Sequence, residues 1–180
     1  MNKKIPIIIA AAAVITVSSA LIVFKRKNKK ILHLKSYDGR FVIEFPDEWK
    51  ASKEQNELNE NSNLEAVNNK KGICFIMFSK HKNELNNINL YEYNKTIFNS
   101  IKEENIISSR KININNKTMY ATEFNSYYEN MLIHYILYTL ETENYFHQVM
   151  AALINNNLKI KKDKVQFNTI NNILSTLKEI

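Results

Sequence analysis

Residues 132–153, LIHYILYTLETENYFHQVMAAL, decide the fold. Two apolar runs, Leu132–Leu140 and Tyr145–Leu153, flank the polar segment Glu141–Asn144, which predicts two antiparallel strands joined by a short turn. The first run is apolar at consecutive positions, a pattern typical of a strand that is covered on both faces. We therefore expect a sheet with other elements packed on each of its sides.

Further strands are predicted on the N-terminal side of this hairpin. Ile106–Ile114 and Lys117–Ser126 flank Asn115-Asn116, a pair that tolerates positive φ, so a second hairpin is expected directly before the first. Ile73–Ser79 is apolar on both faces and should be central to the sheet. Shorter strands are predicted at Ile31–Ser36, Arg40–Phe45 and Leu64–Val67, and Asp38-Gly39 between the first two is a strong turn signal.

Two helices are predicted from apolar residues at helical spacing. The first spans Leu90–Glu104, with Asn89 as its N-cap, and the second begins at about Asp163. The order is strands, one helix, four strands and a final helix. This order predicts an α+β layer sandwich around a largely antiparallel sheet.

The N-terminal run Ile5–Phe24, IPIIIAAAAVITVSSALIVF, has 20 residues and no charge. A helix of that length spans about 30 Å, the thickness of a bilayer core. Ser18-Ser19-Ala20 would also suit cleavage of a signal peptide, but apolar Leu21–Phe24 follows directly, which favours an uncleaved transmembrane anchor. The expected organisation is residues 1–24 as anchor, 25–36 as basic linker and first strand, and 37–180 as the α/β domain.

The positive net charge of +7 belongs to the N-terminal region. Residues 1–35 hold eight of the 25 basic residues and no acidic ones. The rest of the chain therefore has 17 basic and 18 acidic residues, a net charge of −1. A nucleic-acid-binding domain should carry its own basic surface, so this class is not expected. Five basic residues follow the apolar run and two precede it, which favours a cytoplasmic domain, whereas a short basic tail before a long apolar core resembles an export signal.

The sequence offers no recognised catalytic or metal-binding motif, so no cofactor and no metal are expected. Two glycines cannot build a P-loop or a dinucleotide-binding loop, and Cys74 lies alone in an apolar strand. If residue 140 pairs with 145, His134 and His147 lie four residues apart along the hairpin, about 13 Å, too far to share zinc. Glu141 and Glu143 are interpreted as solvated turn residues.

Three aromatic residues are candidates for a contact surface. Trp49 follows Pro46 at the end of a predicted strand, where it would plug the core or stack on a ligand. Tyr127 and Tyr128 lie near a strand end, where they could form an exposed patch.

The pattern resembles the PsbP-like family over about residues 37–180. The resemblance rests on DGRFVIEFPDEW at 38–49, LYEY at 90–93, ININNKTMYATEF at 112–124 and the segment 133–153, followed by a helix. The family's usual hairpin turn holds Asn-Gly, whereas this chain has Asn115-Asn116. The resemblance implies an α/β/α sandwich around an antiparallel sheet and a non-enzymatic module, and it transfers no site residues.

These observations lead to a first hypothesis and two alternatives. The first is a membrane-anchored, extracytoplasmic binding or assembly module, held in lipid by residues 5–24 and acting on a protein partner at the cell envelope. The second is a membrane-tethered regulator that faces the cytoplasm. The third is a hydrolase that uses His134, His147 and Glu143.

Overall fold

The computed structural model describes residues 31–52, 57–101, 105–128, 131–153 and 164–180. The predicted anchor at residues 5–24 lies outside these ranges. Within them, no helix is both long enough and apolar enough to cross a bilayer.

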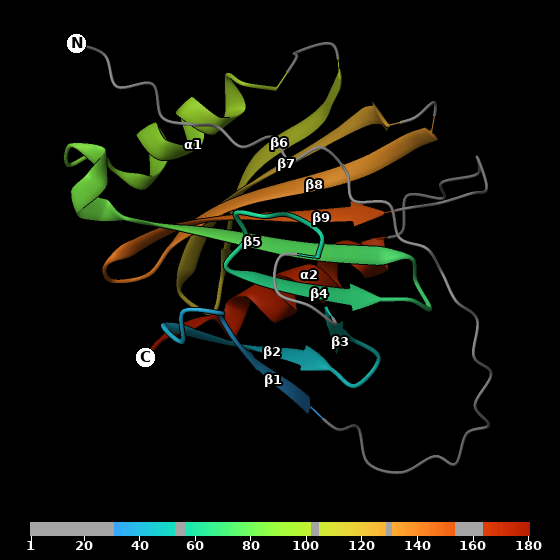
Figure 1. Cartoon of the computed structure of the whole chain (residues 1–180). Coiled ribbons are helices and arrows are strands. Elements are labelled where there is room, and N and C mark those ends of the chain that lie inside the picture. The colour runs from blue at the N-terminus through green and yellow to red at the C-terminus, as the bar shows by residue number, and fades with distance from the viewer. Residues whose placement is uncertain (1–30, 53–56, 102–104, 129–130, 154–163) are drawn as a thin grey trace.

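Two antiparallel sheets form the framework of the domain (Figure 1). The large sheet has seven strands in the order β3-β4-β5-β9-β8-β7-β6, and the small sheet has three in the order β1-β2-β10. The large sheet contains β3 (Lys50–Ala51), β4 (Leu64–Asn68), β5 (Ile73–His81), β6 (Ile106–Ile114), β7 (Lys117–Tyr128), β8 (Met131–Glu141) and β9 (Tyr145–Leu153). The small sheet contains β1 (Ile31–Lys35), β2 (Phe41–Pro46) and β10 (Lys178–Glu179).

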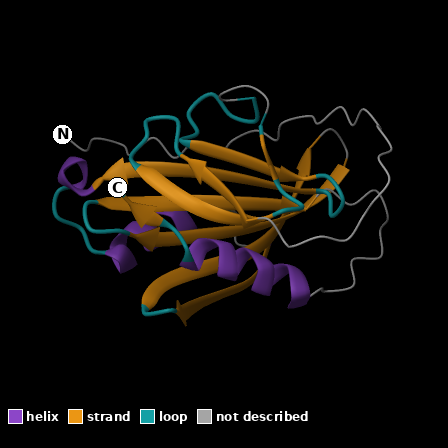
Figure 2. Cartoon of the chain, turned by 90° about the horizontal axis from the view of Figure 1, so that it is seen from below, coloured by secondary structure: helices purple, strands orange, loops and turns teal. Residues whose placement is uncertain are grey.

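The large sheet is covered on both faces, which confirms the predicted α+β sandwich. Strands make up most of the described chain, with the helices beside them (Figure 2). Helix α1 (Leu90–Phe98) and the 3-10 helix η1 (Lys82–Leu85) cover one face. Helix α2 (Lys164–Ser175) and the small sheet cover the other, opposite α1 in Figure 1.

Each face has its own apolar core. The core on the α2 side joins the inward residues of β2 to the large sheet, and Phe41, Ile43 and Tyr138 in it are completely buried. The core on the α1 side includes Tyr93, whose ring stacks on Phe146 with centroids 4.8 Å apart. Strands β8 and β9 contribute to both cores, which confirms the expected cover on both faces of this hairpin.

Helix α1 begins as predicted but ends earlier. Asn89 accepts a hydrogen bond from the Glu92 N–H, and the Glu92 carboxylate accepts one from the Asn89 N–H, which forms a capping box. The helix was expected to continue to Glu104, but it ends at Phe98. The Ser100 N–H and hydroxyl both donate to the Ile97 carbonyl, which tightens the last turn and stops the helix.

The pairing of β8 with β9 differs from the predicted register by two residues. Leu140 lies opposite His147, not Tyr145, because the Thr142 N–H donates to the Tyr145 carbonyl and closes a tighter turn. The predicted four-residue loop therefore shrinks to Glu143-Asn144. A shift of two keeps every side chain on its predicted face, so the core is unaffected.

Candidate functional site

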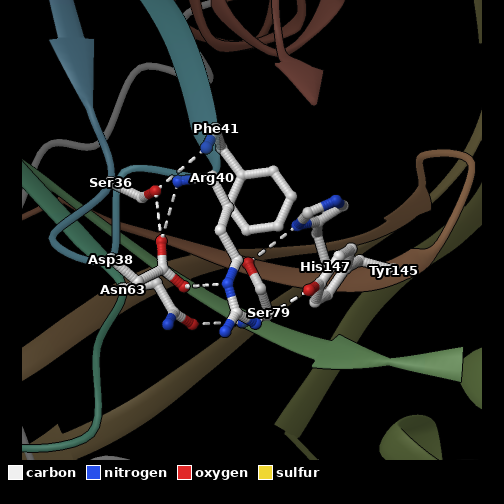
Figure 3. A network of polar contacts seen from close by, with 8 residues as sticks. All are labelled: Ser36, Asp38, Arg40, Phe41, Asn63, Ser79, Tyr145 and His147. Atoms are coloured by element: carbon white, nitrogen blue, oxygen red, sulfur yellow. Dashed lines mark hydrogen bonds and ion pairs between the residues drawn. The ribbon is translucent and has the colours of Figure 1, made fainter. Parts of the chain in front are cut away.

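A network of polar contacts surrounds Tyr145, where the β1–β2 turn meets the ends of β5 and β9 (Figure 3). The Tyr145 hydroxyl accepts a hydrogen bond of 2.7 Å from Nη1 of Arg40, whose guanidinium also lies over the Tyr145 ring. The rings of Phe41 and His81 meet Tyr145 edge-on, each with centroids 4.9 Å apart. Arg40 is thus held in place while its side chain stays 56 % exposed.

The β1–β2 turn supplies the second support for Arg40. Asp38 accepts a 2.6 Å bond from the Ser36 hydroxyl and a bond from the Arg40 N–H, and its carboxylate lies 3.7 Å from Nε of Arg40. Gly39 has a φ of 73°, which the turn requires and which a side chain would oppose. The Asp-Gly turn predicted from the sequence therefore also orients the arginine.

In the same network, His147 lies between two hydroxyl groups. Nδ1 is 2.9 Å from Oγ of Ser79, and Nε2 is 3.0 Å from Oγ1 of Thr142. In a neutral imidazole one of these two nitrogens donates to its hydroxyl partner and the other accepts.

Burial keeps the ring of His147 neutral. The side chain is completely buried, and burial lowers its pKa to about 3. A base with so low a pKa is a poor acceptor for a serine proton near pH 7. The Ser79–His147 contact therefore stabilises the end of the sheet and gives no nucleophile of the serine-hydrolase kind.

His134 belongs to a separate polar group at the other end of β8. Its Nε2 lies 3.0 Å from the Glu123 carboxylate and its Nδ1 lies 2.9 Å from Oδ1 of Asn125. His134 is opposite Leu153 in the ladder, six residues from the level of His147, or about 20 Å. The predicted spacing of four residues was too short, and the three residues of the hydrolase hypothesis do not converge.

The remaining titratable candidates have structural surroundings. Glu141 forms a 2.8 Å ion pair with Lys82, and Glu143 lies in the exposed β8–β9 turn. Cys74 is buried in β5, and burial, followed by the charge of Glu65, raises its pKa to about 12. Within the described ranges, no three or more His, Cys, Asp or Glu side chains are grouped to hold a metal ion.

The candidate contact aromatics have different surroundings. Trp49 is 2 % exposed and packs against Phe45 and Phe75, so it plugs the core and cannot stack on a ligand at the surface. Tyr127 is 74 % exposed near the end of β7, and Tyr128 pairs with Met131 where β7 turns into β8. The structure does not bring Trp49 together with the two tyrosines in one surface.

Sequence reasoning missed Arg40, Tyr145 and Ser79 as members of one site. The Arg40–Tyr145 bond joins residues 105 apart in the chain, and no motif spacing marks such a contact. The only available signals were the Asp-Gly turn before Arg40 and the polar residues at the ends of apolar strands.

The fold of the described residues is similar to the folds of a PsbP protein and of Mog1p. No family model and no curated protein matches the sequence. Its similarity to solved structures is therefore a similarity of fold.

Three similar structures span nearly the same length as this chain. Cyanobacterial PsbP (CyanoP) from Synechocystis has a TM-score of 0.53 and 8 % identity, covering 92 % of this chain and 99 % of its own. LpqN of Mycobacterium tuberculosis, described as involved in cell envelope biogenesis, has a TM-score of 0.54 and 8 % identity, and the match covers 84 % of this chain and 91 % of LpqN. The Ran-binding protein Mog1p of Saccharomyces cerevisiae has a TM-score of 0.54 and 7 % identity, and the match covers 84 % of this chain and 96 % of Mog1p.

A Bacteroides thetaiotaomicron protein matches with a TM-score of 0.56 and 12 % identity over 82 % of this chain. The match spans only 48 % of that protein, so this chain corresponds to about half of it.

Proposed function

We propose that this protein is a non-enzymatic binding or assembly module of the PsbP-like family, tethered to the membrane by residues 5–24, with its domain outside the cytoplasm. The shared fold is the observation that carries the proposal. Mog1p is described as a Ran-binding protein and LpqN as involved in cell envelope biogenesis. A module of this class acts through its surface, so we expect a protein partner at the cell envelope.

The chemistry of the polar network supports a binding role over catalysis. His147 is neutral, buried and saturated by two hydroxyl groups. The exposed member of the network is Arg40, which is held by Tyr145 and Asp38. A preorganised arginine beside an aromatic ring is a common anchor in protein interfaces.

The membrane tether is supported by the sequence. The uncharged run of 20 residues matches the bilayer core, and the basic residues around it match lipid headgroups. Only residues 25–30 separate this run from Ile31, the first residue of β1, so the domain would lie within about 20 Å of the membrane surface.

A cytoplasm-facing regulator is the second candidate. One observation favours it: five basic residues follow the apolar run and two precede it, the distribution expected when the following domain stays inside. It shares the anchor and the binding role with the first proposal and differs only in the side of the membrane.

Isolation of the full chain from gently solubilised membranes tests the binding role. After brief cross-linking, we expect one protein to be recovered in a constant ratio with the full chain. The Arg40→Ala, Tyr127→Ala double variant removes two exposed side chains. It should lower the amount of partner recovered if the partner contacts either residue. Recovery of the bare protein alone, with and without cross-linking, would contradict the binding role.

A further inference from the structure

We infer that the free edge of strand β6 docks an extended, acidic segment of a partner protein, which adds a strand to the large sheet. The inference rests on the proposed binding function and assigns it a surface in addition to the exposed Arg40. Within the described part of the chain, β6 is the outermost strand on its side of the large sheet (Figure 1). It has nine residues, whereas β3 at the opposite edge has two.

The β6–β7 hairpin shows which backbone groups face outward. Asn115 and Asn116 have φ values of 49° and 62°, and Ile114 pairs directly with Lys117, so the turn is a two-residue type with a hydrogen-bonded closing pair. Hydrogen-bonded pairs alternate along an antiparallel ladder. The N–H and C=O groups at positions 109, 111 and 113 therefore point away from β7 and are available to another strand.

The side chains at this edge carry positive charge on both faces. Lys111 is exposed and lies opposite Tyr120 on the α1 side, where the Tyr120 ring is 6.3 Å from the ring of Tyr91. Arg110 is exposed on the α2 side, with its guanidinium 4.5 Å from the centre of the Phe167 ring. An added strand would thus meet adjacent cations at its centre and aromatic surface beside them.

These charges select the occupant. Acidic residues opposite Arg110 and Lys111 would form cross-strand ion pairs on each face of the sheet. A second copy of the chain is a poor occupant, because antiparallel pairing centred on β6 would set Arg110 against its own copy. Basic residues of this kind are also what natural edge strands use to prevent self-association.

Peptide binding to the full chain in detergent micelles tests the inference. The probe is a labelled nine-residue peptide with two central glutamates between alternating threonine and valine residues. The control peptide has two lysines in place of the glutamates. We expect the glutamate peptide to bind at least ten times more tightly by fluorescence anisotropy. Its binding should slow amide hydrogen exchange at Ser109, Lys111 and Asn113.

Two variants separate backbone pairing from charge. Lys111→Pro removes an outward N–H without breaking the ladder to β7, since edge strands tolerate proline there. It should weaken binding at least tenfold, whereas Lys111→Gln, which removes only the charge, should weaken it less. The Arg110→Glu, Lys111→Glu double variant should prefer the lysine peptide, and circular dichroism checks that each variant is folded.

Four results would overturn the inference: no binding, equal binding of both peptides, unchanged binding by Lys111→Pro, or an edge already filled in the free protein. The last would show as slow exchange at positions 109, 111 and 113 without peptide, or as a dimer broken by Lys111→Pro. If wild type and Lys111→Pro recover the same partner from solubilised membranes, that partner does not bind at β6, and the proposed binding role still stands. Absence of any partner would count against the binding role itself.

Discussion

At the scale of single residues, His147 illustrates how burial decides between catalysis and structure. Its imidazole lies between Ser79 and Thr142 at hydrogen-bond distance, an arrangement that resembles part of a catalytic group. Complete burial and the lowered pKa keep the ring neutral, so it orders the strand ends without taking up a proton.

The state of His147 predicts a pH dependence of stability. The folded pKa of about 3 lies below the unfolded value of 6.5, so the unfolded chain binds the extra proton first as pH falls. The contribution of His147 is present above pH 6.5 and is lost from there toward pH 3, at up to about 1.4 kcal/mol per pH unit. Urea unfolding of wild type between these limits should show this slope.

The His147→Gln variant should be less stable near neutral pH and should lose less stability on acidification. The matched control is His33→Gln, because the His33 side chain is 61 % exposed and should leave the slope as it is in wild type. Parallel slopes for wild type and His147→Gln would contradict the assignment of a buried neutral imidazole.

Cys74 gives a second prediction at this scale. The thiol is buried in β5, and its pKa is raised to about 12, so little thiolate forms at neutral pH. Iodoacetamide should label Cys74 in the folded protein only as fast as the domain opens, and rapidly in urea, as mass spectrometry can follow. Equal labelling rates with and without urea would show that β5 is accessible.

At the scale of elements, the β6–β7 turn is the most direct test of local geometry. Asn115 and Asn116 both have positive φ, which asparagine tolerates and glycine adopts without strain. Asn116→Gly should therefore raise the free energy of unfolding by up to about 1 kcal/mol, whereas Asn116→Ala should lower it. Thermal unfolding of the two variants checks this, and equal losses in both would contradict the turn type.

The elements differ in how well the sequence predicts them. Ile106–Ile114 and Tyr145–Leu153 occur with the predicted bounds, because long alternating or apolar runs determine where a strand can begin and end. The strands β3 and β10 were not predicted, since two residues are too short to show a period. The end of α1 also depends on Ser100, whose hydroxyl bonds locally, and apolar spacing alone does not register that competition.

Contacts between elements far apart in the sequence could not be predicted. The β1–β2 hairpin was expected from its Asp-Gly turn, but its separation into a small sheet depends on pairing with β10 at the far end of the chain. The Arg40–Tyr145 bond depends on the same long-range packing. The sequence thus indicates which residues are buried, while the polar site arises only where distant strand ends meet.

At the scale of the whole molecule, the C-terminal segment ties the two sheets together. The Glu179 carboxylate accepts hydrogen bonds from the N–H and Nδ2 of Asn144 in the β8–β9 turn, while β10 pairs with β2. The Ile180 N–H donates to the Arg40 carbonyl. The polar network and residues 179–180 therefore form one unit. This unit lies at the Lys35 end of β1, whereas the predicted anchor precedes Ile31 at the other end.

Trypsin treatment of intact cells that produce the full chain tests the central claim most directly, because residues 25–30 carry five trypsin sites between the predicted anchor and the folded domain. We predict that a folded fragment beginning within or just after this linker is released into the medium before lysis. In lysed cells the same fragment should appear whatever the orientation, which controls for access. A full-length chain that stays with intact cells, and is cut only after lysis, would contradict an extracytoplasmic domain and favour the cytoplasm-facing regulator.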